Sequence, residues 1–292
     1  QKLAACLGSA VLQSRAAVGG DINQAFAVQL ADGRKLFVKT QSAALPGLFP
    51  AEAHGLRWLS EARALRVPEV LHASDADTLG PACLVLELIE SARPCPRYDE
   101  QLATGLAALH RRGAEGFGLK RDNYLATLPQ DNRVRARWAE LYAEQRIAPQ
   151  VERAARSGEL GAGLARRLEQ LIARLPQLVG PEEPPARLHG DLWGGNVIRD
   201  ELGEPVLIDP AVYGGHREID LAMMRLFGGF GDAVFAAYDE AFPLSAGHAE
   251  RVPLYQLYPL LAHVNLFGSA YLAQLEHCIA HALLDDQTRP RR

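Results

Sequence analysis

Three oxygen-bearing side chains, Asp191, Asn196 and Asp209, have types and spacing that suit phosphoryl transfer from a nucleotide. Such transfer needs a carboxylate to orient the acceptor hydroxyl and oxygen ligands to hold metal ions against the phosphates. Asp191 and Asn196 are five positions apart, as are the corresponding residues of a kinase catalytic loop. The apolar run at 206–208 predicts a buried strand that ends on Asp209, where a second metal carboxylate is expected. Because Asp and Asn beside glycine also form turns, a plain turn is the alternative interpretation.

A lysine upstream supports a nucleotide site. Asp32-Gly33 predicts a hairpin turn, and the strand that follows, residues 35–39, ends on Lys39. Kinases place the lysine that holds the α- and β-phosphates on such a strand, although a strand lysine is more often simply solvated. Residues 51–66 predict a helix with Glu52 in its first turn. Glu52 either complements the helix dipole there or pairs with Lys39, and we favour the pair.

Two further stretches have the character of nucleotide-contacting segments. The turn Gly19-Gly20-Asp21-Ile22-Asn23 has adjacent glycines, which let backbone N–H groups approach phosphates but also form an ordinary hairpin turn. Residues 84–89 predict an apolar strand, and Arg93-Pro94-Cys95-Pro96 ends that pattern. We interpret this region as the hinge between two lobes, with Glu87, Leu88 and Ile89 facing an adenine edge. A plain interdomain connector would look much the same.

The chain is expected to form two lobes. Residues 1–90 predict a small nucleotide-binding lobe, an antiparallel sheet with one helix against it, and residues 91–292 predict a larger, mainly helical lobe for catalysis and substrate binding. The fold class is therefore α+β. Asp220 precedes a helix-like stretch, residues 221–230, and suits either a helix cap or a brace behind the catalytic loop. Further helical stripes, which we assign to packing, run through residues 98–109, 160–175 and 252–284.

Composition excludes several classes of protein. With 48% hydrophobic and 23% charged residues among 292, the chain is typical of a soluble globular protein. It has neither an apolar run long enough for a membrane span nor an N-terminal signal segment, so we expect a cytoplasmic protein. The formal net charge of −4 gives no overall attraction to nucleic acid. The four cysteines lack paired metal-ligand spacing, so we expect buried free thiols, without zinc or a structural disulfide.

Long stretches of the chain resemble the fructosamine kinase family, also called the ketosamine 3-kinases. That family lies within the aminoglycoside-phosphotransferase-like and protein-kinase-like fold, so the resemblance implies a bilobal protein-kinase-like architecture. The most specific stretch is His189-Gly190-Asp191-Leu192-Trp193-Gly194-Gly195-Asn196. The other matching stretches are residues 122–124, 129–132, 145–150, 208–213 and 215–223.

The resemblance implies a kinase that uses ATP and Mg²⁺ to phosphorylate the 3-hydroxyl of a ketosamine, a sugar attached to an amine by glycation. Asp191 is then the catalytic carboxylate, Asn196 and Asp209 hold magnesium, and Lys39 with Glu52 positions the phosphates under the turn at residues 19–23. The ketosamine is either a small molecule or carried on a protein. The residues expected to contact it are Asn123, Gln130, Asn132, Trp193, Tyr213 and His216.

Two other functions compete with this one. A kinase of the same fold that acts on an aminoglycoside, choline or a free sugar is the nearest, and the family-like stretch at 122–150 argues against it. A catalytically silent nucleotide-binding scaffold is the second. Such a protein is expected to have lost a residue of the catalytic set, and Lys39, Asp191, Asn196 and Asp209 are all present.

Overall fold

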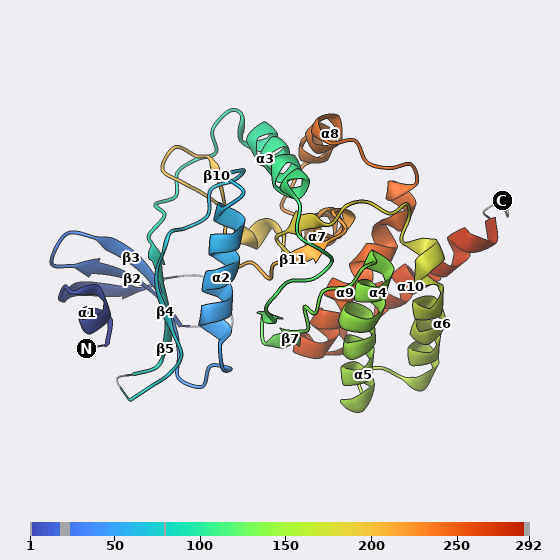
Figure 1. The fold of residues 1–292 in the computed structure, drawn as a ribbon, viewed down its shortest axis with the longest axis horizontal. Coiled ribbons are helices and arrows are strands. Elements are labelled where there is room, and N and C mark those ends of the chain that lie inside the picture. The colour runs from blue at the N-terminus through green and yellow to red at the C-terminus, as the bar shows by residue number, and fades with distance from the viewer. Residues whose placement is uncertain (1, 18–23, 79, 289–292) are drawn as a thin grey trace.

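The computed structural model describes residues 2–17, 24–78 and 80–288. A sheet with the helix α2 forms one side of an elongated molecule, and a larger group of helices forms the other (Figure 1). This arrangement confirms the α+β, bilobal fold expected from the sequence. The glycine turn expected at residues 19–23 lies outside the described residues. Strand β5 ends at Glu87 and helix α3 begins at Tyr98, while the exact lobe boundary at residue 90 stays a prediction.

Among the described residues the N-lobe has a five-stranded antiparallel sheet in the order β1-β2-β3-β5-β4. Residues alternate between its faces as the pleat requires. Leu36 and Val38 of β3 pack with the core beside α1, whereas Phe37 faces the core beneath α2. The N-lobe elements are α1 (Lys2–Leu7), β1 (Val11–Ala16), β2 (Gln24–Leu30), β3 (Lys35–Gln41), α2 (Leu48–Ser60), β4 (Val70–Ser74) and β5 (Ala82–Glu87).

Helix α2 differs from its expected bounds of 51–66 at both ends. It begins after Gly47 and ends at Ser60, because the chain then turns through Arg63, whose φ is 52°. Glu52 consequently lies in the second turn of α2. The expectation of a first-turn carboxylate at the helix dipole is therefore wrong, and the alternative partner, Lys39, is the one that Glu52 contacts.

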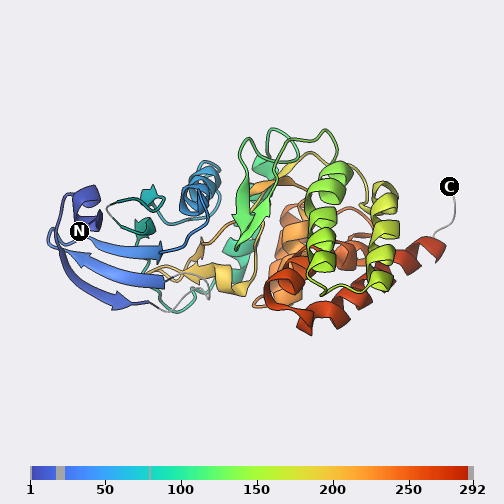
Figure 2. The same ribbon diagram turned by 90° about the horizontal axis from the view of Figure 1, so that it is seen from below.

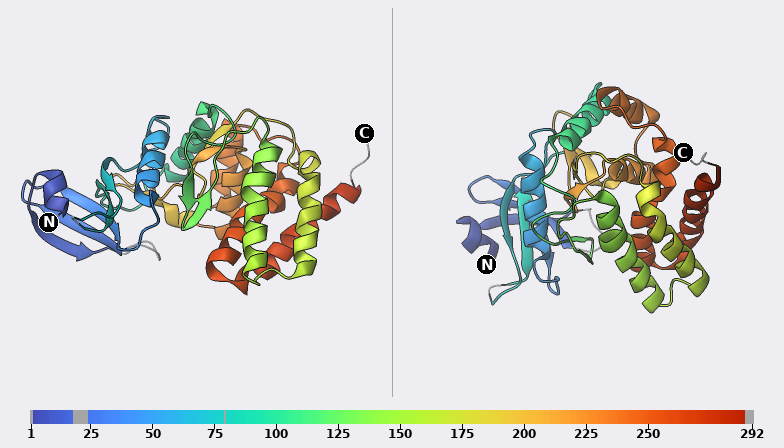
Figure 3. Two further views of the ribbon diagram at one scale, coloured as in Figure 1. Left: turned by 60° about the horizontal axis from the view of Figure 1, so that its bottom comes forward. Right: turned by 45° about the vertical axis from the view of Figure 1, so that its right-hand side comes forward.

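The C-lobe surrounds one large hydrophobic core. Helices α5, α6, α9 and α10 pack against one another (Figure 3), and α3 packs against α8. The expected helical stripes are confirmed as α3, α6, α9 and α10. The helices are α3 (Tyr98–Arg112), α4 (Trp138–Leu141), a π-helix η1 (Tyr142–Ile147), α5 (Ala148–Arg156), α6 (Ala162–Leu178), α7 (Glu218–Phe227), α8 (Asp232–Ala241), α9 (His248–Phe267) and α10 (Leu272–Thr288), with 3₁₀ turns η2 (Gly194–Asn196) and η3 (Ser269–Tyr271).

Short strand pairs place the chemistry-bearing loops between the lobes. Strand β8 pairs with β11 and β9 with β10, so the loop from β8 to β9 lies beside the loop from β10 to β11. The hairpin of β6 and β7 lies between α2 and the C-lobe helices (Figure 2). The strands are β6 (Asn123–Leu125), β7 (Leu128–Gln130), β8 (Ala186–Leu188), β9 (Val197–Arg199), β10 (Pro205–Leu207) and β11 (Tyr213–Gly215).

The four cysteines are free. Cys83 and Cys278 are buried, as expected, but Cys95 is only half-buried and Cys6 is exposed.

Candidate active site

A buried lysine joins the two lobes. Lys39 on β3 is 5% exposed, and its Nζ lies 2.8 Å from Glu52 Oε1 and 2.5 Å from Asp209 Oδ1. Burial works against the charge of this ammonium, but the two carboxylates outweigh burial and raise the pKa of Lys39 above its ordinary value. The expected pairing of Lys39 with Glu52 is therefore present. Asp209, 170 positions away in the chain, is a second carboxylate partner of Lys39.

The loop from β8 to β9 brings Asp191 and Asn196 together. The amide Nδ2 of Asn196 donates to the backbone oxygen of Asp191 at 2.8 Å and to its Oδ2 at 2.9 Å. These bonds fix the amide and leave its carbonyl oxygen for a ligand. His189 holds the start of the loop, because its Nε2 bonds Ile208 O at 2.9 Å and its Nδ1 accepts from the backbone N–H of Asp191 at 3.3 Å.

Asp220 braces this loop from behind. Its two carboxylate oxygens accept from the backbone N–H groups of His189 (2.8 Å) and Gly190 (2.9 Å), and His110 Nε2 lies 3.2 Å from Oδ2. Burial favours the neutral acid, but these hydrogen bonds hold the pKa of Asp220 below its usual range. Because α7 begins at Glu218 without a side-chain cap, the brace was the correct alternative of the two proposed for Asp220.

The surroundings of Asp191 change its proton affinity. Burial raises the pKa of Asp191 to about 7, against the opposing hydrogen bond from Asn196, and the nearby charges of Asp209 and Asp220 add to the rise. A carboxylate whose pKa lies near neutrality suits a general base, since it can both take and release a proton under ordinary conditions.

These groups line one cavity of about 210 Å³. Lys39, Glu52, Asp191, Asn196 and Asp209 contribute its polar wall. Hairpin β6–β7, which is expected to bind the substrate, and α9, which is expected only to pack, line the same cavity. The lining residues that the sequence did not indicate are Leu48, Ala51, Tyr124, Leu125, Ala126, Pro210, Ala211, Ala262, His263, Leu266 and Phe267. The exposure of Phe267, 52%, is a tertiary property that the helical stripe does not reveal.

The residues expected to contact the acceptor are divided between the cavity and the core behind it. Asn123 and Trp193 line the cavity, and the Trp193 side chain is 40% exposed. Gln130 and Asn132 are buried behind Asn123 and hydrogen-bonded to it. Of these four residues, Asn123 and Trp193 are therefore the ones placed to touch an acceptor. Contact between any of the four and an acceptor stays a prediction.

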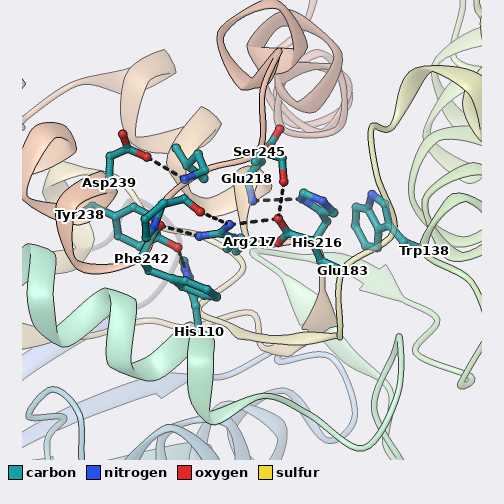
Figure 4. A network of polar contacts seen from close by, with 12 residues as sticks. His110, Trp138, Glu183, His216, Arg217, Glu218, Tyr238, Asp239, Phe242 and Ser245 are labelled. Carbon is teal, nitrogen blue, oxygen red and sulfur yellow. Dashed lines mark hydrogen bonds and ion pairs between the residues drawn. The ribbon is translucent and has the colours of Figure 1, made fainter.

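Tyr213 and His216 lie deeper in the C-lobe. The ring of His216 stacks on that of Tyr255 with centroids 5.3 Å apart. It lies beside Trp138 in a buried polar network centred on Arg217, whose guanidinium binds Glu183 at 2.7 and 3.0 Å (Figure 4). Tyr213 is fully buried, and neither Tyr213 nor His216 is among the described residues that line the cavity. A contact between either side chain and the acceptor stays a prediction.

The proposed hinge residues 87–89 are not among the described residues that line this cavity. Glu87 ends β5 and binds Arg66 at 3.1 Å, while the backbone N–H of Leu88 donates to Lys35 O at 3.3 Å. Ile89 follows in the irregular segment that leads to α3. Adenine recognition by residues 87–89 stays a prediction.

The oxygen donors of the cavity fit a magnesium ion that arrives with a nucleotide. Asp209 has a φ of 55°, a left-handed conformation that Asp tolerates, and its carboxylate faces the cavity beside Asn196. Among the described residues no group of three or more His, Cys, Asp or Glu could hold a metal alone. Mg²⁺ is commonly bound by one or two protein oxygens together with substrate phosphates, which is the set offered here.

A family model described as fructosamine kinase matches residues 1–285. The chain belongs to the fructosamine kinase family. A probable ketoamine kinase of Thermus thermophilus is 42% identical over 90% of this chain and 91% of its own length. The chloroplastic protein-ribulosamine 3-kinase of Arabidopsis thaliana is 36% identical over 93% of this chain and 81% of its own.

Solved structures agree with this family. A candidate fructosamine-3-kinase from Thermobifida fusca is 43% identical, covers 97% of each chain and superposes with a TM-score of 0.89. Amicoumacin kinase, solved with AMP-PNP and Ca²⁺, is 16% identical with a TM-score of 0.59 over 94% of this chain and 89% of its own, and shares the fold alone. The chain is thus an ATP-dependent phosphotransferase, and the expectation of a ketosamine kinase is confirmed at the level of the family. None of the helices in the described ranges is both long and apolar enough to cross a membrane.

Proposed function

We propose that this member of the fructosamine kinase family transfers the γ-phosphoryl group of ATP to the 3-hydroxyl of a ketosamine, a step in the repair of glycated amines. The observation that carries the proposal is the grouping of Asp191, Asn196, Asp209 and the Lys39–Glu52 pair on one wall of a cavity large enough for a sugar. The ribulosamine and ketoamine kinases to which the chain is similar support the acceptor class.

Asp191 acts as the base in this proposal. Its carboxylate accepts a hydrogen bond from the acceptor hydroxyl and takes the proton as the new P–O bond forms. The amide of Asn196 holds the Asp191 carboxylate at 2.9 Å, and Asp220 fixes the backbone on which Asp191 stands. Lys39 supplies a fixed positive charge for the phosphates, because Glu52 holds its ammonium at 2.8 Å.

Asn196 and Asp209 are the residues that hold the divalent cation, which we propose to be Mg²⁺. When bound, the ion offsets the negative charge of the phosphates. A cytoplasmic location belongs to the same proposal. The distant kinase of this fold that was solved with an ATP analogue and Ca²⁺ supports a nucleotide with a divalent cation.

The acceptor class is tested by ADP release from purified protein with ATP and Mg²⁺. Four acceptors are compared, namely fructoselysine, ribuloselysine, an aminoglycoside and choline, and the phosphorylated position of any product is assigned by ³¹P–¹H correlation. We expect turnover of one or both ketosamines with phosphate on the 3-hydroxyl. Turnover confined to the aminoglycoside or choline would overturn the acceptor class, and turnover of none would favour the silent scaffold.

A further inference from the structure

Arg146 is a fully buried arginine in the π-helix η1. Within the described residues its hydrogen bonds go to neutral oxygens. Nη1 donates to the backbone oxygens of Asp131 (2.8 Å) and Gln145 (3.1 Å), and Nη2 donates to Asn132 Oδ1 (2.6 Å). The guanidinium also lies 4.0 Å above the ring of Tyr213. A buried charge held in this way is costly, and π-helices are frequent at functional sites, so a structural role alone is a poor explanation.

The arginine determines which way the Asn132 amide points. A guanidinium is always protonated and can only donate, so the atom of Asn132 that it contacts must be the oxygen. The Asn132 nitrogen is thereby turned the other way, and Nδ2 donates to Asn123 Oδ1 at 2.8 Å and to Arg121 O at 3.1 Å.

A second amide converges on the same atom. The hydroxyl of Tyr258 donates to Gln130 Oε1 at 2.7 Å, which directs Gln130 Nε2 toward Asn123 Oδ1 at 2.9 Å and the backbone oxygen of Ala211 at 3.3 Å. Asn123 Oδ1 therefore receives two N–H donors, which fixes the orientation of its own amide.

The amide nitrogen of Asn123 is the end of this chain of hydrogen bonds. It carries two hydrogens, of which one goes to Val212 O at 2.8 Å. The second is the one left for a ligand. Asn123 lines the cavity that also holds Asp191 and Asn196, so its side chain is within the site where the acceptor must lie.

We propose that Arg146, acting through Asn132, orients the Asn123 amide so that Asn123 presents an N–H donor to an oxygen of the acceptor sugar. The hydrogen bonds from Arg146 to Asn132 and from Asn132 to Asn123 are called the relay below. Asn123 is then an acceptor-binding residue, and Arg146 and Asn132 are positioning residues that never touch the substrate. The inference rests on the proposed function for the existence of a sugar acceptor, but it concerns different residues from those that transfer the phosphate.

The substitution that separates this idea from a structural role is Asn132→Asp. It keeps the size of the side chain and gives the buried guanidinium a carboxylate partner, so a purely structural role predicts a stable protein with ordinary kinetics. The relay predicts a stable protein with altered kinetics, because an ionised carboxylate cannot donate to Asn123 Oδ1 and instead repels it. Gln130 is then the one remaining donor described for Asn123 Oδ1, and the repulsion works against the orientation that it supports. We expect the acceptor KM to rise about tenfold, the usual worth of one hydrogen bond, with the KM for ATP unchanged.

A double-mutant cycle links the two ends of the relay. Asn123→Ala alone should raise the acceptor KM by a similar factor, and adding Asn132→Asp to it should change that KM little further, because the donor that the relay orients is already gone. Asn123→Ala also tests the donor directly if Asn132→Asp fails to fold. Arg156→Lys is the control, since Arg156 is an exposed arginine that binds Glu152, and it should leave both KM values unchanged.

The outcomes distinguish the two proposals. An active wild type with an unchanged acceptor KM in Asn132→Asp, or in Asn123→Ala, overturns the relay and leaves the proposed function intact. A wild type that phosphorylates only an aminoglycoside or choline overturns the proposed function, and the relay is then decided by the same cycle on that acceptor. A wild type with no turnover of any of the four compounds overturns both.

Discussion

Asp191 combines a catalytic carboxylate with surroundings that oppose its charge. Burial and the neighbouring acids Asp209 and Asp220 raise its pKa to about 7, while the hydrogen bond from Asn196 opposes them. The same surroundings give Asp191 the proton affinity of a base that works at neutral pH and destabilise the folded protein when Asp191 is ionised. Two predictions at the scale of this residue follow from that conflict.

The first prediction concerns turnover. Asp191→Asn keeps the shape of the side chain but cannot accept the proton of the acceptor hydroxyl, so kcat for the ketosamine should fall by about 10²–10⁴. Nucleotide affinity, measured by titration calorimetry with ADP and Mg²⁺, should be largely kept. Turnover at the wild-type level would remove Asp191 from the role of base.

The second prediction concerns stability in the absence of nucleotide and metal. Asp191 has a folded pKa of about 7 against an ordinary value of 3.8, so between these pH values the folded protein holds a proton that the unfolded chain has released. The contribution of Asp191 to stability therefore falls as the pH rises from about 4 to 7. Asp191→Asn removes this loss. As the pH rises from about 4 to 7, the free energy of unfolding of the variant should increase relative to that of the wild type by up to about 4 kcal/mol.

Denaturant unfolding of both proteins at pH 5, 6, 7 and 8 in EDTA measures this difference. A constant difference between wild type and Asp191→Asn at all four pH values would show that Asp191 has an ordinary pKa. Because the comparison is between two otherwise identical chains, the titration of buried histidines elsewhere cancels.

At the scale of the element, the catalytic loop depends on a close backbone approach at Gly190. Gly190 has a φ of 83°, its N–H donates to Asp220 Oδ1, and an added Cβ would lie 2.0 Å from the backbone oxygen of Ala211. Neither backbone segment can move without shifting Asp191 or the loop that carries Asp209. Only glycine fits this position.

Gly190→Ala should therefore abolish turnover and lower the free energy of unfolding by several kcal/mol, measured by chemical denaturation. Gly158→Ala is the matched control. Gly158 has nearly the same φ, 81°, but no atom lies within 4 Å of an added Cβ. Gly158→Ala should lower the free energy of unfolding only by the left-handed backbone penalty of about 1–2 kcal/mol, and it should leave kcat unchanged. Equal effects at the two positions would show that steric clash at the loop is unimportant.

At the scale of the whole molecule, buried ion pairs join the start of α7 to the rest of the C-lobe. Arg251 binds Glu218 at 2.6 and 2.9 Å, and the two side chains are 4% and 5% exposed. Arg217, the next residue before α7, is held by Glu183 and by the backbone of the segment after α8. These contacts position the helix that carries Asp220, so the brace of the catalytic loop depends on the packing of the whole lobe.

Arg251→Met should lower the free energy of unfolding by about 3–5 kcal/mol, because it leaves the carboxylate of Glu218 buried without its partner. The exposed pair Arg156–Glu152, with side chains 72% and 71% exposed, supplies the comparison. Arg156→Met should cost less than about 1 kcal/mol. Thermal and denaturant unfolding measure the loss of unfolding free energy in each variant. Similar losses in the two would contradict a cost for leaving the buried carboxylate of Glu218 unpaired.

The sequence by itself determined the chemistry and the local elements that carry it. The spacing of Asp191 and Asn196, the apolar run before Asp209 and the strand ending near Lys39 are local patterns, and periodicity reports local structure well. The choice between cap and brace for Asp220 was left open, because a carboxylate near a helix start looks the same in sequence whether it bonds its own helix or a loop 30 positions away.

Only the tertiary structure decided which residues meet. Glu52 and Asp209 share Lys39 across 13 and 170 positions, α9 supplies a wall of the cavity, and Asn132 and Gln130 orient Asn123 from behind. The direction of an amide also depends on its partners, and these come from distant parts of the chain. Local sequence encodes periodicity and turn chemistry, whereas contacts between distant segments are fixed by the packing of both lobes around one cavity.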